Sequence, residues 1–267
     1  MPGFTNTYRR PEGKFKGKTV WVTGAETALG SAAADAFERE GARVLRSGVD
    51  GTPNPLTEEE AVDQISGIDK LDVLVTANRS IMVKPLLDTD CVEFDREIER
   101  NLTSVCCVMR AAIAKMSMER ISPESISGNG AMLIISSIHG EKPNGSAGLY
   151  SMACGGLNML AREAAQEFGR LGVRVNLIAP GPIDGEPELF PSEITALYDD
   201  AADKVPLGRL GSPEEIAKAA LFLCSDDASF INGALIPCDG GFLGYYGDAD
   251  VDKRVAAYAA GKEARHG

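Results

Sequence analysis

Three side chains near the middle of the chain, a serine, a tyrosine and a cysteine, are of types that can exchange protons. Ser137 follows a predicted buried strand, residues 131–136, and Tyr150 opens a predicted helix that starts near Leu149. Cys154 comes four residues after Tyr150, on the same face of that helix. A tyrosine phenol has a pKa of about 10, so it is a weak base near neutral pH unless a cation lies beside it. A cation about 5 Å away would lower that pKa by roughly two units at an effective dielectric of about 20, and Cys154 supplies no such charge.

A glycine turn near the start of the chain has the pattern of a nucleotide-binding loop. Residues 18–22 read as a buried strand, and the following turn, TGAETALG, opens a helix. Glycines let the backbone approach a pyrophosphate, and the N-terminus of the helix stabilises its negative charge. The candidate cofactor-binding residues of this turn are Thr23, Gly24 and Gly30.

The elements that must position these residues alternate between strands and helices, as in a doubly wound parallel sheet. Further strands are predicted at residues 42–46, 71–75, 131–136, 173–179 and 233–237. A short helix with a Thr57–Glu60 capping box precedes the third of the six predicted strands, and one helix is expected over residues 88–121. We therefore predict a single Rossmann-like α/β domain over residues 17–243, an N-terminal arm over 1–16 and a C-terminal tail over 244–267.

Together these motifs resemble the short-chain dehydrogenase/reductase family over roughly residues 15–243. The resemblance implies that Ser137 bonds the substrate oxygen and Tyr150 transfers the proton. It also implies that Asn101, in ERNLTSV, bends its helix and relays a water to a lysine four residues after the tyrosine. The PGPIDG sequence resembles the PGxIxT motif of the family. The further cofactor-binding candidates that it implies are Pro180, Gly181 and Ile183.

At several cofactor contacts the chain departs from the family pattern. Cys154 replaces the lysine, Gly185 replaces the threonine of PGxIxT, and Ser47 or Gly48 stands where NAD-dependent members carry an acid. The segment between the second strand and residues 71–75 is shortened, because the family has an additional strand and helix there. We expect this shortening to truncate the adenine side of the pocket.

Four further charged or titratable residues stand near these contacts. Glu26 places a carboxylate in the glycine turn, where it would repel a phosphate unless it points outward. Arg79 replaces the last glycine of the NNAG sequence and would fill the vacated pocket, bind an anion or face solvent. His139 and Lys142 are the candidates to replace the missing lysine, with a role in the pocket wall as the alternative.

We therefore predict a degenerate family member that binds no dinucleotide itself. It would support an active paralogue, which carries NAD, in a hetero-oligomer expected to be a tetramer. The small-molecule substrate of that complex would be an alcohol such as a hydroxyacyl-CoA. In kind, the chain resembles the non-catalytic subunit of heteromeric hydroxy(phenyl)methylsuccinyl-CoA dehydrogenase.

Two alternatives remain open. The first is a working NAD(P)-dependent oxidoreductase with an altered proton relay that uses Ser137 and Tyr150. The second is a cofactor-free lyase or dehalogenase; halohydrin dehalogenases keep the serine and tyrosine but place an arginine at the position of Cys154.

Composition excludes several other classes of protein. The 267 residues carry a net charge of −12, which argues against nucleic acid or an anionic membrane as the partner. There is no apolar run of about 18 residues, so we expect no transmembrane helix, and the first residues do not read as a signal peptide. The 6 cysteines lack metal-ligand spacing. We expect no metal site, and reduced thiols in a cytoplasmic protein.

Overall fold

A computed structural model of the chain describes residues 13–49, 54, 56–116, 128–143, 147–185 and 201–244. Six strands form one sheet, with all neighbours parallel, in the order β2-β1-β3-β4-β5-β6. The strands are β1 (Thr19–Thr23), β2 (Arg43–Arg46), β3 (Val73–Thr76), β4 (Gly130–Ile135), β5 (Val173–Pro180) and β6 (Leu235–Cys238). This order confirms the predicted Rossmann-like doubly wound α/β fold.

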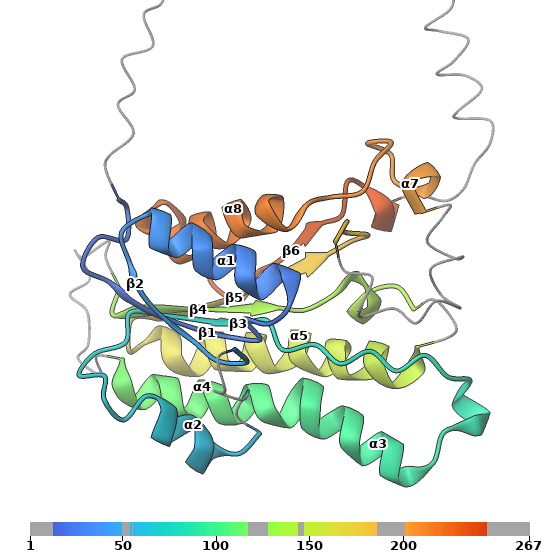
Figure 1. Cartoon of the computed structure of the whole chain (residues 1–267), viewed down its shortest axis with the longest axis horizontal. Helices are drawn as coiled ribbons and strands as arrows, with labels where there is room; N and C mark the ends of the chain where they lie inside the picture. The colour runs from blue at the N-terminus through green and yellow to red at the C-terminus, as the bar shows by residue number, and fades with distance from the viewer. Residues whose placement is uncertain are drawn as a thin grey trace, which may run out of the picture.

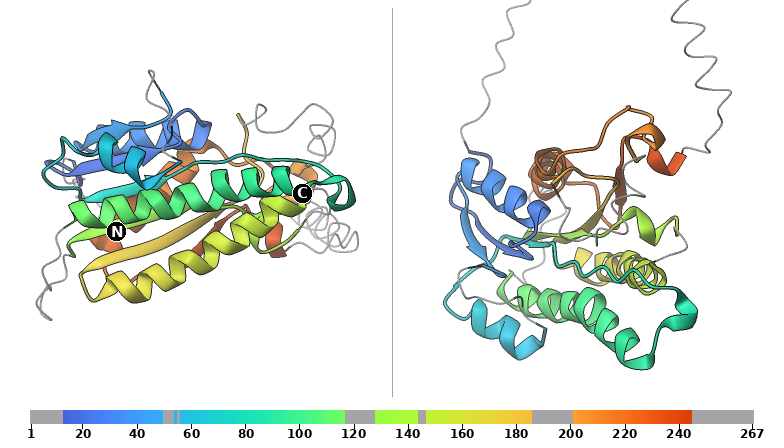
Figure 2. Two further views of the ribbon diagram at one scale, coloured as in Figure 1. Left: turned by 90° about the horizontal axis from the view of Figure 1, so that it is seen from below. Right: turned by 45° about the vertical axis from the view of Figure 1, so that its right-hand side comes forward.

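Helices cover both faces of the sheet, which makes three layers (Figure 1). They are α1 (Ala28–Arg39), α2 (Glu58–Gln64), α3 (Cys91–Ile98), α4 (Ser104–Lys115), α5 (Gly148–Gly169), α7 (Ala201–Lys204) and α8 (Pro213–Cys224). The helices α1 and α8 pack together on one face, and α2, α4 and α5 lie on the other. Figure 2 shows α4 and α5 running side by side along the sheet.

Two hydrophobic cores form because consecutive side chains of a strand point to opposite faces of the sheet. In β3, Leu74 joins the core under α4 and α5, whereas Val73 and Val75 join the core under α1 and α8. In β1, Trp21 points to the first of these cores and its neighbours point to the second. Strands buried on both faces read as continuous apolar runs, and this is the pattern from which the sequence predicted them.

The single helix expected over residues 88–121 is wrong, because it is interrupted within the described part of that range; residues 117–121 lie outside the described residues. The helix α3 ends at Ile98, a π-helical turn follows at Glu99–Thr103, and α4 then runs to Lys115. Such a turn contains one extra residue and rotates the side chains that follow. Here the turn carries Asn101 into the interior, where it is 2% exposed.

The segment between β2 and β3 is short, as the sequence predicted. Among its described residues the only regular element is α2, which begins with the expected capping box of Thr57 and Glu60. As a result β2 forms the edge of the sheet.

Little of the predicted arm and tail is described, because residues 1–12 and 245–267 lie outside the described ranges. Phe15, which we assigned to the arm, is buried and packs edge-on against Phe37 of α1 with ring centroids 4.7 Å apart. The packed part of the chain therefore begins before residue 17.

Candidate functional site

The candidate residues gather at the carboxyl edge of the parallel sheet, where doubly wound folds form their sites. Ser137 lies just past the end of β4, and Tyr150 lies in the first turn of α5. Both side chains are 1% exposed, and the phenol of Tyr150 hydrogen-bonds to the Ser137 side chain. The structure therefore brings together the pair that the sequence selected.

Cys154 lies one helical turn beyond Tyr150 and supplies no charge to it. The thiol is 2% exposed, within hydrogen-bonding reach of the hydroxyl groups of Tyr150 and Ser136. Burial raises the pKa of the Cys154 thiol to about 11, so the group is neutral near neutral pH. This position cannot perform the electrostatic role of the lysine.

A cation reaches Tyr150 from another part of the chain. Arg79, which follows β3, donates a hydrogen bond from Nε to the Tyr150 oxygen at 3.2 Å. The sequence left three alternatives for Arg79: filling the pocket, binding an anion or facing solvent. The contact with Tyr150 places its side chain in the pocket. Burial nevertheless raises the pKa of Tyr150 above its usual value, because the loss of solvent outweighs the opposing effect of the Arg79 charge.

His139 also lies beside the phenol. Its ring centroid is 5.7 Å from that of Tyr150, with the planes at 63°. Burial, and then the charge of Arg79, lower the pKa of His139 to about 4, so the ring is neutral at physiological pH. Within the described part of the chain, its buried Nδ1 atom has no hydrogen-bond partner. His139 therefore forms a neutral wall of the pocket and does not replace the lysine charge.

Lys142, the other candidate, lies elsewhere. Its Nζ atom is 5.5 Å from the ring centroid of Phe242, in a cation–π contact. Lys142 therefore contacts the 3-10 turn that follows β6.

Asn101 holds the backbone beside Arg79. Its Oδ1 atom accepts from the Ser80 amide at 2.8 Å, and its Nδ2 atom donates to the Ser80 carbonyl at 2.8 Å. The same Nδ2 donates to the carboxylate of buried Glu97 at 3.0 Å, and Ser80 Oγ donates to Glu97 at 3.2 Å. Burial raises the pKa of Glu97. Asn101 therefore has a structural role, which is to hold the Ser80 backbone against α3.

The glycine turn is built as a dinucleotide-binding turn is built. Gly24 has φ of 73°, and a Cβ atom there would lie 2.3 Å from the Ala77 carbonyl carbon. A Cβ atom on Gly30 would lie 2.0 Å from the Gly24 oxygen, so helix, turn and strand pack closely only with glycine at both positions. Thr23 is buried, and its hydroxyl has no partner among the described residues.

The PGPIDG loop packs against the end of β6 and the segment before α8. The amide of Gly181 donates to the Cys238 carbonyl at 3.0 Å, and a Cβ atom at this position would lie 2.6 Å from the Asp239 Cα. Pro180 ends β5, and buried Ile183 forms a parallel bridge with Gly211. These contacts pack the loop between β6 and the segment before α8.

Comparison with known proteins finds relatives over most of this chain. A family model described as enoyl-(acyl carrier protein) reductase matches residues 54–243. The chain is 33% identical to cis-4-hydroxycyclohexanecarboxylate dehydrogenase of Sinomonas cyclohexanicum, over 85% of this chain and 97% of that protein. It is also 33% identical to the 3-oxoacyl-(acyl-carrier-protein) reductase FabG of Chlamydia trachomatis, over 85% of this chain and 88% of the relative. The chain belongs to the short-chain dehydrogenase/reductase family, whose members are oxidoreductases.

A solved structure of a short-chain type dehydrogenase/reductase from Mycobacterium ulcerans has the same fold. It superposes with a TM-score of 0.76 at 27% sequence identity, covering 86% of this chain and 91% of that chain.

At the glycine turn, a side chain of this protein bonds to one of the backbone amides that would meet a pyrophosphate. The amide of Gly24 donates to Asn54 Oδ1 at 2.6 Å, and the Asn54 amide donates to the carboxylate of Glu26. The other carboxylate oxygen of Glu26 lies so close to Gly48 that a Cβ atom there would be 1.8 Å from it. A pyrophosphate at this turn would displace Asn54 and approach a carboxylate, which repels it.

The residues at the end of β2 are also engaged. Ser47 Oγ accepts from Trp21 Nε1 at 2.9 Å and bonds to Gln64, so it is not directed to a ribose. Arg46 forms ion pairs with Asp35 at 2.7 Å and Glu38 at 2.9 Å.

A cavity of about 260 Å³ lies beside the glycine turn. It is lined by Glu26, Asn54, Leu56, Asn78, Arg79, Ser80 and Arg100. The residues present do not fit a dinucleotide in this arrangement.

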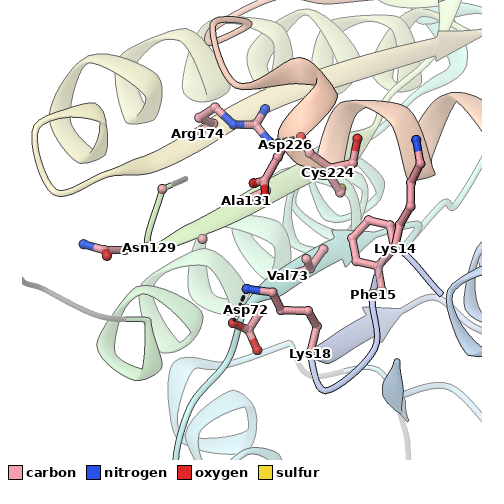
Figure 3. Close-up of a pocket in the computed structure, with 13 residues that line it drawn as sticks. Lys14, Phe15, Lys18, Asp72, Val73, Asn129, Ala131, Arg174, Cys224 and Asp226 are labelled. Carbon is pink, nitrogen blue, oxygen red and sulfur yellow. Dashed lines mark hydrogen bonds and ion pairs between the residues drawn. The ribbon is translucent and has the colours of Figure 1, made fainter. Parts of the chain in front are cut away.

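A separate cavity of about 50 Å³ lies at the opposite edge of the sheet, and Figure 3 shows its lining. Its charged groups stabilise the fold: Arg174 donates to the Leu223 and Ser225 carbonyls at the end of α8, and Lys18 bonds to Asp72 at 3.4 Å. In the described ranges no helix is long and apolar enough to cross a membrane. No cluster of potential metal ligands occurs in those ranges either.

Sequence reasoning did not select Asn54 or Glu97. Asn54 stands in a loop, where nothing in the local pattern indicates a partner 30 residues away. Glu97 could have been selected from the sequence, because it precedes Asn101 by four residues and the two share a helix face.

Proposed function

We propose that this chain binds no dinucleotide and serves as the supporting subunit of a hetero-oligomer with an active relative. The hydrogen bond from the Gly24 amide to Asn54 carries the proposal. A phosphate-binding turn acts through backbone amides that are open to the ligand, and here one of them is satisfied internally. The Glu26 carboxylate beside it adds a repulsive charge.

The state of the proton-transfer pair supports the same proposal. Tyr150 is buried under other side chains, and its pKa is raised rather than lowered. A tyrosine that transfers protons near neutral pH needs the opposite shift, because catalysis is most efficient when the pKa lies near the working pH. The site therefore keeps its geometry while lacking the electrostatics of an efficient base.

The surface of α5 supports an assembly. Met152 and Met159 stand seven residues apart on the exposed side of this helix, 42% and 55% exposed. Phe94 of α3 is also exposed. Helix faces with methionine and aromatic residues in contact with solvent are typical of protein interfaces.

The experiment is calorimetric titration of the purified chain with NAD, NADH, NADP and NADPH. We expect no binding at concentrations up to about 1 mM, which corresponds to less than about 4 kcal/mol of binding free energy. Trp21, whose indole bonds to Ser47 beside the cofactor site, provides a fluorescence check. Micromolar binding of any of the four nucleotides would reject the proposal.

A second candidate is an NAD(P)-dependent oxidoreductase that acts on a secondary alcohol or ketone. The Arg79–Tyr150 contact favours it, because a cation does stand beside the phenol. The relatives favour it as well, since they are named as a dehydrogenase of a hydroxycarboxylate and a reductase of a 3-oxoacyl carrier protein. Protonated Tyr150 and Ser137 would donate hydrogen bonds to one substrate oxygen, once Asn54 and Glu26 had moved to admit the cofactor.

Turnover by Tyr150→Phe separates the two candidates. The second candidate predicts measurable oxidation of hydroxyacyl substrates by the native chain and a loss of about 100-fold or more in the variant. The first predicts that neither protein turns over alone.

A further inference from the structure

We infer that residues 79–84 form an internal plug that fills the pocket above Tyr150 and is locked there by Glu97 and Asn101. The inference deepens the proposed function and rests on it, because a plugged pocket explains how the chain keeps a family site without using it.

The plug covers the reactive groups directly. Arg79 bonds to the Tyr150 oxygen at 3.2 Å, and the side chains of Ile81 and Val83 pack against the cluster of Ala147, Tyr150 and Cys154. The plug contributes both a polar contact and an apolar cover, so Tyr150 and Cys154 are 1% and 2% exposed. A substrate could reach the phenol only if these side chains moved.

The near end of the plug is fixed by α3 and the π-helical turn. Asn101 satisfies both backbone groups of Ser80, and Glu97 accepts from the Ser80 hydroxyl and from the Asn101 amide. A buried carboxylate is tolerated only where hydrogen bonds compensate for its lost hydration. Among the described residues, the Glu97 carboxylate accepts hydrogen bonds from Ser80 and Asn101, so its burial serves this lock.

The far end of the plug is fixed as well. Lys84 forms a parallel bridge with Ala147 at the start of α5. Its ammonium group lies 2.8 Å from each carboxylate oxygen of Glu93 on α3. With both ends tied to packed helices, the plug is part of the folded domain rather than a solvated loop.

The test uses Cys154 as a reporter of the pocket. The full chain is treated with iodoacetamide under native conditions, and alkylation of each cysteine is followed by mass spectrometry of peptides. Cys224, buried at the end of α8 away from the plug, reports opening of the whole domain. In Arg79→Ala and in Ile81→Ala we expect Cys154 to react about tenfold faster while Cys224 keeps its native rate, because the rate follows the free energy of local opening.

Leu87→Ala is the matched control. Leu87 is 99% exposed and lies three residues beyond the plug, so its removal should leave both cysteines at their native rates. A selective rise at Cys154 in either plug variant, with the control unchanged, supports the plug. The plug is overturned if neither variant shows a selective rise at Cys154, whether Cys154 stays protected or both cysteines react together.

This measurement contains no nucleotide, so its failure is distinguishable from failure of the proposed function. Micromolar nucleotide binding by the native chain would reject the supporting-subunit proposal even if Cys154 is released selectively. Absence of nucleotide binding together with an unselective labelling pattern would reject the plug alone.

Discussion

At position 150 the phenol is subject to two opposing effects. Burial disfavours the phenolate, and the Arg79 guanidinium favours it, with burial the larger of the two. The sequence placed Ser137 and Tyr150 correctly because their spacing ties them to a strand end and the next helix. It could not orient Arg79, because the contact with Tyr150 spans 71 residues and depends on how the loop after β3 is held.

His139 provides a test of burial at the scale of one residue. Its pKa is lowered to about 4, whereas an unfolded chain has a histidine pKa of about 6.5. Below about pH 6.5 the unfolded state takes up a proton that the folded state refuses, so stability falls as the pH drops from about 6.5 toward about 4. His139→Gln should remove part of this decline, measured as the urea midpoint at several pH values.

The comparison between native chain and variant is essential, because paired carboxylates also lose stability in acid. The other histidine, His266, belongs to the predicted tail, and His266→Gln serves as the control. If native protein and His139→Gln lose stability in parallel over this range, the ring is not buried in its neutral form.

Capping boxes and strand runs are local features, so they could be read from the sequence. Thr57 with Glu60 closes the capping box at its predicted helix start, and Ser212 with Glu215 closes another at the start of α8. The π-helical turn could not be read in this way. The turn adds one residue to the helix. The hydrogen bonds that stabilise it join Asn101 to Ser80, and these two residues are distant in sequence.

Asn101→Ala tests whether this turn exists to hold the loop after β3. The change leaves the Ser80 amide and carbonyl without their partner in a partly buried region, so we expect a loss of about 2 kcal/mol in the free energy of unfolding. Thr57→Ala, which removes an exposed helix cap, should cost about 1 kcal/mol and is the control. Urea unfolding measures both, and an Asn101 loss no greater than the Thr57 loss would contradict this role.

At the scale of the molecule, the alternation of strands and helices was sufficient to predict the sheet. Parallel strands joined by helices have few permitted orders, and the order of this sheet is one of them. The contacts at the glycine turn could not be predicted in the same way, because they depend on side chains such as Asn54 that come from distant parts of the chain. Within the described ranges no strand lies beyond β2, which forms the edge of the sheet.

The exposed face of α5 gives a prediction about assembly. Met159→Glu places a charge on a helix face that, in the proposed function, is desolvated against an active relative, and a buried unpaired charge is strongly unfavourable. We expect the tagged variant to lose the copurifying relative, detected by mass spectrometry and light scattering, while its circular dichroism spectrum is unchanged.

Val62→Glu on α2 is the matched control, because Val62 is also an exposed apolar residue, 45% exposed, on a helix away from α5. Equal recovery of the relative with both variants would exclude α5 as the interface, and a native chain purified without any relative would exclude the hetero-oligomer itself.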